Sequence, residues 1–168
     1  MVLSTIILII SFFIDSISSN LIAYTLTNSS ILMTIYTVVA IFVFYRYFDY
    51  DKKYLILTLV FGLFFDIACS NTFLLNTTIF FLIALIIKFI YMFLSDNVLT
   101  TLIISVIAVV AYYSLSYLIV IIVNYGDYPL FLLWEAIYKS LIMTIIYSGI
   151  LYFVAQILYN KFNIKFIK

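Results

Sequence analysis

Residues 54–70 read YLILTLVFGLFFDIACS, an apolar run that is broken by a single carboxylate at Asp66. The run is as long as an α-helix needs to be to cross the hydrocarbon core of a bilayer, which takes roughly 17–25 residues. Five further apolar stretches flank it, at residues 3–26, 31–48, 77–94, 98–123 and 130–159. Their lengths favour helices over barrel strands. We therefore expect an all-α integral membrane protein, a compact bundle of about six transmembrane helices.

The overall composition points the same way. Of the 168 residues, 68% are apolar and 9% are charged, whereas a soluble domain has about half apolar and about a quarter charged residues. Six spans with short loops fill residues 1–168 as a single transmembrane domain and leave no room for an extramembrane catalytic domain. The formal net charge of +1 disfavours binding to the phosphate backbone of nucleic acids.

Catalytic and metal-binding patterns are absent from the sequence. The chain has no histidine and one cysteine, Cys69, so it lacks a Cys/His set for zinc, haem or a thiol–imidazole nucleophile. It also lacks a glycine-rich phosphate loop. One enzymatic alternative is an intramembrane aspartyl protease with Asp15 and Asp66 as its dyad, but the motifs that flank the two acids in that family are missing. We expect a protein that is not an enzyme and has no cofactor or metal.

The basic residues predict the orientation of the bundle. They gather in the loop after the second span and in the tail after the sixth, at Arg46, Lys52, Lys53, Lys161, Lys165 and Lys168. The loops that follow the first, third and fifth spans contain no Lys or Arg. Because cytoplasmic loops are enriched in Lys and Arg, both termini are expected to be cytoplasmic.

Two carboxylates, Asp15 and Asp66, lie deep within their spans. A carboxylate near the middle of a bilayer costs roughly 3 kcal/mol, so such groups usually face protein or water. They could form a substrate, ion or proton site, or they could fix helix packing, and we favour packing because no buried base accompanies them. Asp66 continues a stripe of Thr58 and Gly62 at a spacing of four residues, and Gly62 would let another backbone approach closely.

The surroundings of the two acids are similar. Each acid follows a Phe-Phe pair, and each is followed at the same offset by Ser-Asn. A parallel internal repeat is one explanation, and coincidence in a biased sequence is the other. Further small and polar stripes suited to helix packing occur in the other spans, at Ser4, Ser11 and Ser18, at Ser105, Ala108, Tyr112 and Ser116, and at Ser140, Thr144, Ser148 and Tyr152.

Glu135 and Lys139 lie four residues apart near the outer end of the sixth span. This order favours an ion pair within the helix. The pair could anchor the helix at the membrane interface, or it could contact a partner outside the cytoplasm.

Three segments of the chain stand out, Phe-Gly-Leu-Phe-Phe-Asp-Ile at residues 61–67, Leu-Leu-Asn-Thr at residues 74–77, and Leu-Leu-Trp-Glu-Ala-Ile-Tyr-Lys-Ser at residues 132–140. With them, the chain resembles the rod shape-determining protein MreD family. In the family, a glycine in the third span is followed four residues later by an acid, as Gly62 is by Asp66. The family commonly has a Leu-Gly pair before the fourth span, whereas here the segment reads Phe73-Leu74-Leu75-Asn76.

The resemblance implies a non-enzymatic scaffold of the bacterial elongation complex, which organises lateral peptidoglycan synthesis and cell shape at the plasma membrane. It implies direct binding to MreC, with MreB, RodA and its transpeptidase reached through the complex. A homodimer is left open.

The alternative function is that of a substrate-binding S component of an energy-coupling-factor micronutrient transporter, which is similar to the MreD family in architecture. S components dock their coupling subunit through Ala-x-x-x-Ala-type motifs. No such pair occurs in the first or third span, and the outer loops are short.

Overall fold

The computed structural model describes residues 2–25, 35–47, 51–70, 74–94, 97–123 and 129–161. These residues are all-helical and contain no strand, as the sequence predicted. The elements are α1 Val2–Thr25, α2 Tyr36–Val43, a 3-10 turn η1 Phe44–Tyr47, α3 Asp51–Phe65, a π-helical turn η2 Asp66–Ser70, α4 Leu75–Tyr91, α5 Val98–Ile122 and α6 Leu130–Lys161.

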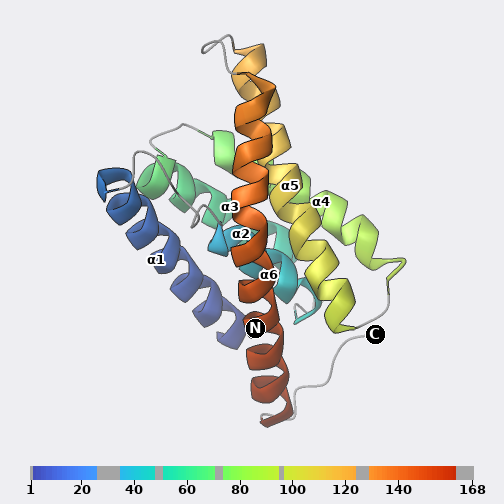
Figure 1. Cartoon of the computed structure of the whole chain (residues 1–168). Helices are drawn as coiled ribbons and strands as arrows, with labels where there is room; N and C mark the ends of the chain where they lie inside the picture. The colour runs from blue at the N-terminus through green and yellow to red at the C-terminus, as the bar shows by residue number, and fades with distance from the viewer. Residues whose placement is uncertain are drawn as a thin grey trace.

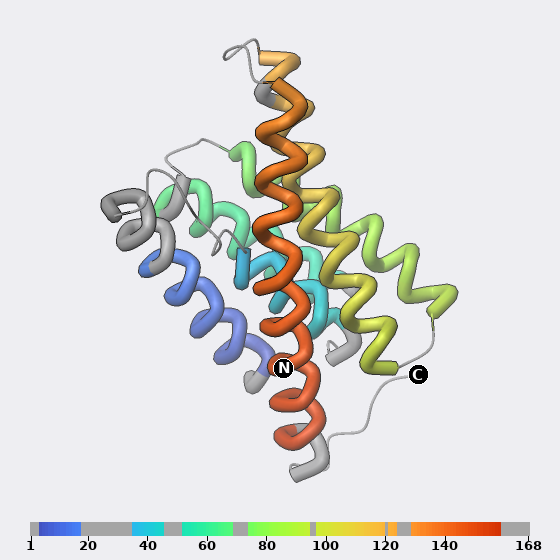
Figure 2. The backbone as a smooth tube through the Cα atoms, in the orientation of Figure 1, coloured from blue at the N-terminus to red at the C-terminus, as the bar shows by residue number. Residues whose placement is uncertain are grey.

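The helices pack as neighbouring pairs, α1 with α2, α3 with α4, and α5 with α6. Figure 1 shows α5 and α6 as the longest pair, which extends beyond the other helices at the upper end of the view. With 32 residues, α6 is about 48 Å long. The tube in Figure 2 places the N-terminal end of α1 and the C-terminal end of α6 at the same, lower end of the bundle.

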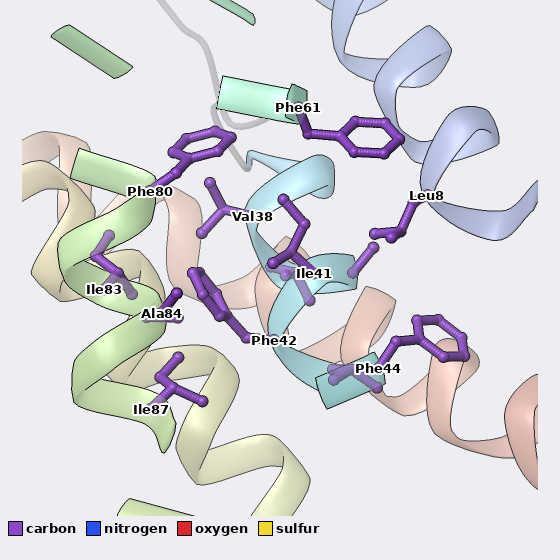
Figure 3. Packing of buried hydrophobic residues seen from close by; sticks show 14 of the residues in the cluster. Leu8, Val38, Ile41, Phe42, Phe44, Phe61, Phe80, Ile83, Ala84 and Ile87 are labelled. Carbon is purple, nitrogen blue, oxygen red and sulfur yellow. The ribbon is translucent and has the colours of Figure 1, made fainter. Parts of the chain in front are cut away.

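The short helix α2 lies at the centre of the bundle. It contacts α1, α4, α5 and α6, and every residue from Thr37 to Val43 is buried. Figure 3 shows Val38 and Phe42 turned toward Phe80, Ile83, Ala84 and Ile87 of α4, while Leu8 of α1 lies on the opposite side of α2. Apolar side chains therefore enclose α2 on both sides.

The prediction of one continuous helix over residues 31–48 was wrong. The α-helical part of that segment begins at Tyr36, after Ile35 in an extended conformation, and gives way at Phe44 to the 3-10 turn. An α-helix of eight residues is about 12 Å long. Hydropathy could not show this start, because the first backbone N–H groups of α2 bind a side chain of another helix. Residues 31–34 and 48 lie outside the described part of the chain.

The other boundaries are close to those predicted. α4 begins at Leu75 rather than at Thr77, so Asn76 belongs to its first turn and is not a loop residue. Two segments of the described helices, Val98–Ile119 and Leu130–Leu158, are long and apolar enough to cross a membrane. The apolar helical segments Ser4–Ile17 and Leu75–Tyr91 are shorter.

Candidate functional site: two buried carboxylates

The Asp66 carboxylate caps the N-terminus of α4. The backbone N–H groups of Asn76 and Thr77 donate to its two oxygens over 2.8 and 2.9 Å. The Asn76 amide and the Thr77 hydroxyl donate over 3.0 and 2.6 Å. The first N–H groups of a helix have no partner within the helix, and the helix dipole favours a negative charge there. Asp66 is 2% exposed, so these donors take the place of water.

Gly62 brings α3 and α4 into close contact one turn before Asp66. A Cβ atom at this position would lie 2.6 Å from the Thr77 Cα and 3.2 Å from the Thr77 nitrogen. Such a distance is well inside van der Waals contact, and both neighbouring atoms belong to the backbone, which cannot rotate away. The close approach therefore requires glycine, as the spacing of Gly62 and Asp66 suggested.

The chain enters α4 through Leu74, whose φ of 61° places it in the left-handed region. This conformation is costly for an L-residue with a Cβ atom and natural for glycine. It turns the backbone so that Leu75 starts the helix and Asn76 and Thr77 meet Asp66.

A tyrosine on α5 holds the Asp66 cap from the other side. The Tyr112 hydroxyl donates to the Asn76 side-chain oxygen over 2.5 Å, so Asn76 uses its amide nitrogen on Asp66 and its oxygen on Tyr112. The Tyr112 ring also packs edge-on against Phe80 at a centroid distance of 6.0 Å. The cap thus joins α3, α4 and α5.

The Asp15 carboxylate caps the N-terminus of α2 in the same way. The backbone N–H groups of Tyr36 and Thr37 donate to its two oxygens over 2.8 and 2.6 Å. Asp15 is 5% exposed, and the Ile35 side chain at the N-cap position offers no hydrogen bond. Because α2 has no cap of its own, the carboxylate from α1 supplies it.

The Asp15 cap is joined to α6 through Tyr147. The Tyr147 and Ser11 hydroxyls share a hydrogen bond of 2.7 Å, and Ser11 also donates to the Ile7 carbonyl over 2.8 Å. The rings of Tyr36 and Tyr147 meet edge to face at a centroid distance of 4.8 Å. These contacts hold α1, α2 and α6 together.

The remaining candidate residues take part in packing or ion pairing. Thr58 is fully buried and donates to the Tyr54 carbonyl over 2.9 Å. Glu135 and Lys139 form an ion pair of 2.5 Å along one face of α6, with side chains 37% and 27% exposed. Lys165 and Lys168, used to predict orientation, lie outside the described residues.

Sequence reasoning singled out both acids but missed the groups that bind them. Tyr36, Thr37, Asn76 and Thr77 were assigned to apolar spans or loop ends, and Tyr112 to a packing stripe. One signal was available, because Asn and Thr are frequent at helix N-termini. The neighbouring sequence, however, does not indicate that such a residue binds an acid 11 or 22 positions earlier.

The two carboxylates accept backbone hydrogen bonds from different helices, Asp15 from α2 and Asp66 from α4, so each acid positions the start of one helix. Among the described residues, no three His, Cys, Asp or Glu side chains gather as a possible metal site. In comparisons with known proteins, no family model, curated protein or solved structure matches the chain.

Proposed function

We propose that the chain is a multi-pass protein of the bacterial plasma membrane and an MreD-like, non-enzymatic scaffold of the elongation complex. The single observation that carries the membrane part is the distribution of side chains. Hydroxyl side chains and two carboxylates lie inside the bundle, and many large apolar side chains are exposed on its outside.

The outer faces of the five longer helices all carry exposed apolar side chains. Examples that are at least two-fifths exposed are Ile6, Ile10 and Phe13 on α1, Ile56 and Phe64 on α3, Leu82 and Phe89 on α4, Leu99 and Ile103 on α5, and Ile142, Ile150 and Phe153 on α6. A soluble monomer rarely exposes apolar patches beyond a few hundred Å². A surface of this kind fits lipid.

The interior shows the converse pattern. Fully buried serine and threonine side chains occur on five helices, at Ser4, Ser11, Thr37, Thr58, Ser105, Ser140, Thr144 and Ser148. Those on α6 donate to carbonyls three or four residues earlier, as Thr144 does to Ser140 over 2.8 Å. Small and polar residues at helix contacts are typical of membrane bundles, since they allow close packing and need partners away from lipid. This favours about six spans, with α2 as a short segment shielded by the others.

The scaffold part of the proposal rests on the resemblance to the MreD family, which the geometry supports at three positions. Gly62 and Asp66 form one functional pair in the structure, because the glycine lets α4 approach and the acid caps it. The segment before α4 lacks the Leu-Gly pair of the family, and within it Leu74 adopts the backbone conformation that favours glycine. The start of α4 thus requires a glycine and an acid at the spacing of Gly62 and Asp66, which gives a physical reason for the resemblance.

As a scaffold, the protein would present fixed helix surfaces to its partners rather than carry out chemistry. In this proposal it binds MreC directly and reaches MreB, RodA and its transpeptidase through the complex. The outer part of α6 is the proposed contact. It carries the Glu135–Lys139 ion pair beside Trp134 and Tyr138, which are 71% and 67% exposed. Exposed aromatic residues are enriched at protein–protein interfaces.

The test is to purify the tagged full-length protein from its native membranes in mild detergent and to identify what co-purifies by mass spectrometry. Recovery of a single-span, coiled-coil MreC-like protein together with cell-wall synthases would support the scaffold. Recovery of paired ATPases with a coupling membrane subunit would overturn it in favour of a transporter S component.

A second experiment tests the contact itself. The double variant Glu135→Ala/Lys139→Ala should lower recovery of the MreC-like partner several-fold at an unchanged level of the protein in the membrane. The matched control is Lys52→Ala/Lys53→Ala, which removes two exposed charges at the start of α3 and should leave recovery unchanged. Equal recovery with both double variants would reject this contact.

A further inference from the structure

Two helix pairs of the bundle share one construction. In both pairs, an acid on the first helix accepts hydrogen bonds from two consecutive backbone N–H groups at the start of the second helix. In both, each carboxylate oxygen takes one of these bonds, and the second donor residue is a threonine, Thr37 or Thr77. The two carboxylates therefore accept the same pair of backbone hydrogen bonds.

The residues before each acid also correspond. Four positions earlier each helix has a small residue, Ser11 in α1 and Gly62 in α3. Aromatic residues beside these small residues pack on one another across the two helices, since the ring of Phe12, which follows Ser11, lies 6.2 Å from the rings of Phe61 and Phe64, on either side of Gly62. Figure 1 shows α1 and α3 next to each other and running in the same direction. A parallel repeat requires this relation between the first helices of its two copies.

We infer that α1–α2 and α3–α4 are two copies of one capped helix pair, in which Asp15 and Asp66 are equivalent positioning residues. Each acid fixes where the following helix begins inside the bundle. The copies differ in the connecting segment, since 22 positions separate Asp15 from Thr37 and 11 separate Asp66 from Thr77. This inference does not rest on the proposed scaffold function.

The third pair, α5–α6, completes each copy with a tyrosine. Tyr112 of α5 donates to Asn76 beside Asp66, and Tyr147 of α6 contacts Ser11 and Tyr36 beside Asp15. The two hydroxyl groups bind different members of the pairs, because Tyr112 donates to Asn76 on the capped helix α4, whereas Tyr147 bonds to Ser11 on the acid-bearing helix α1. The α5–α6 pair thus holds the two copies against each other, which agrees with the contacts of α2 and α4 with α5.

Hydrogen exchange of the full-length protein in lipid nanodiscs tests the inference without reference to any partner. In Asp15→Asn, the amides of Tyr36 and Thr37 should exchange about tenfold faster, while those of Asn76 and Thr77 keep their wild-type rates. In Asp66→Asn the pattern should be reversed. Tyr36→Phe is the control, because Tyr36 binds Asp15 through its backbone.

Two outcomes would overturn the inference. One is that Asp15→Asn leaves the start of α2 as protected as in the wild type. The other is that either variant speeds exchange equally at both helix starts, which would indicate one shared site rather than two copies.

A second pair of variants retains both acids, so the carboxylate of each cap stays in place. Tyr36→Asn places at the first cap the residue that the second cap has at position 76, and its amide can donate to Asp15 as Asn76 donates to Asp66. Tyr36→Ala is the matched variant, since both replacements remove the ring. Equivalence predicts several-fold slower exchange of the Thr37 amide in Tyr36→Asn than in Tyr36→Ala. Equal or faster exchange in Tyr36→Asn would contradict it.

Discussion

Asp66 and Asp15 both cap the helix that follows them, yet the structure around them differs. Asp66 accepts hydrogen bonds from two backbone and two side-chain donors, and Gly62 brings the capped helix into direct backbone contact. Asp15 accepts two backbone hydrogen bonds. The start of α4 is thus held by its own side chains as well as by the acid, whereas the start of α2 depends on the acid of α1.

The difference shows that a carboxylate can cap both a long, partly exposed helix and a short, enclosed one. α4 has 17 residues and exposes one face, so it needs a strong local anchor. α2 has eight residues and is enclosed by four helices, so packing replaces the missing hydrogen bonds. We expect the stability of the Asp66 cap to come mainly from polar contacts and that of the Asp15 cap mainly from its surroundings.

The largest expected effect is that of Asp66→Ala compared with Asp15→Ala. Removing Asp66 leaves buried backbone and side-chain donors unpaired, and each such group costs about 1–3 kcal/mol. We expect the free energy of unfolding to fall by about 3–5 kcal/mol in Asp66→Ala and by about 1–3 kcal/mol in Asp15→Ala. Denaturant unfolding of the purified protein in detergent, followed by circular dichroism, measures both.

Thr78→Ala is the control for that comparison, because Thr78 lies in the same turn of α4 but is exposed and bonds to the Leu75 carbonyl. It should change stability by less than about 1 kcal/mol. An effect of Asp15→Ala equal to or larger than that of Asp66→Ala would contradict the proposed difference between the caps.

The second prediction concerns the close contact that is present at the Asp66 cap. Gly62→Ala would place a Cβ atom against the Thr77 backbone, which forces α3 and α4 apart and should cost about 1–3 kcal/mol. Gly149→Ala on α6 is the matched control, since a Cβ atom there would meet nothing within 4 Å. It should be neutral or stabilising by up to about 1 kcal/mol through higher helix propensity. The same unfolding experiment measures both variants. Similar changes in the free energy of unfolding at the two glycines would show that the close contact at Gly62 does not stabilise the protein.

The same comparison shows what could be predicted from the sequence. The all-helical class and most helix boundaries followed from hydropathy, because apolar length is a local property. Gly62 and Asp66 stood out because glycine and a carboxylate are unusual inside an apolar run. The start of α2 could not be predicted, since Ile35 and Tyr36 carry no capping signal and the acceptor lies 21 positions earlier. Asn76 was placed in a loop because it is polar. Its burial depends on hydrogen bonds to Asp66 and Tyr112, which its neighbours in the sequence do not reveal.

The smallest expected effect has the opposite sign and occurs at Leu74. Its left-handed backbone costs about 1 kcal/mol or more for a residue with a Cβ atom, and its side chain is 42% exposed, so little packing would be lost by truncation. Leu74→Gly should therefore raise the free energy of unfolding by up to about 1 kcal/mol, with part of the gain offset by the greater freedom of glycine in the unfolded chain. Leu75→Gly, one position later and inside the helix, should instead destabilise the protein, because glycine is unfavourable in a helix and the Leu75 side chain is partly buried. If both variants destabilise equally, the turn into α4 does not need a glycine-like conformation, and the Asp66 cap forms without it.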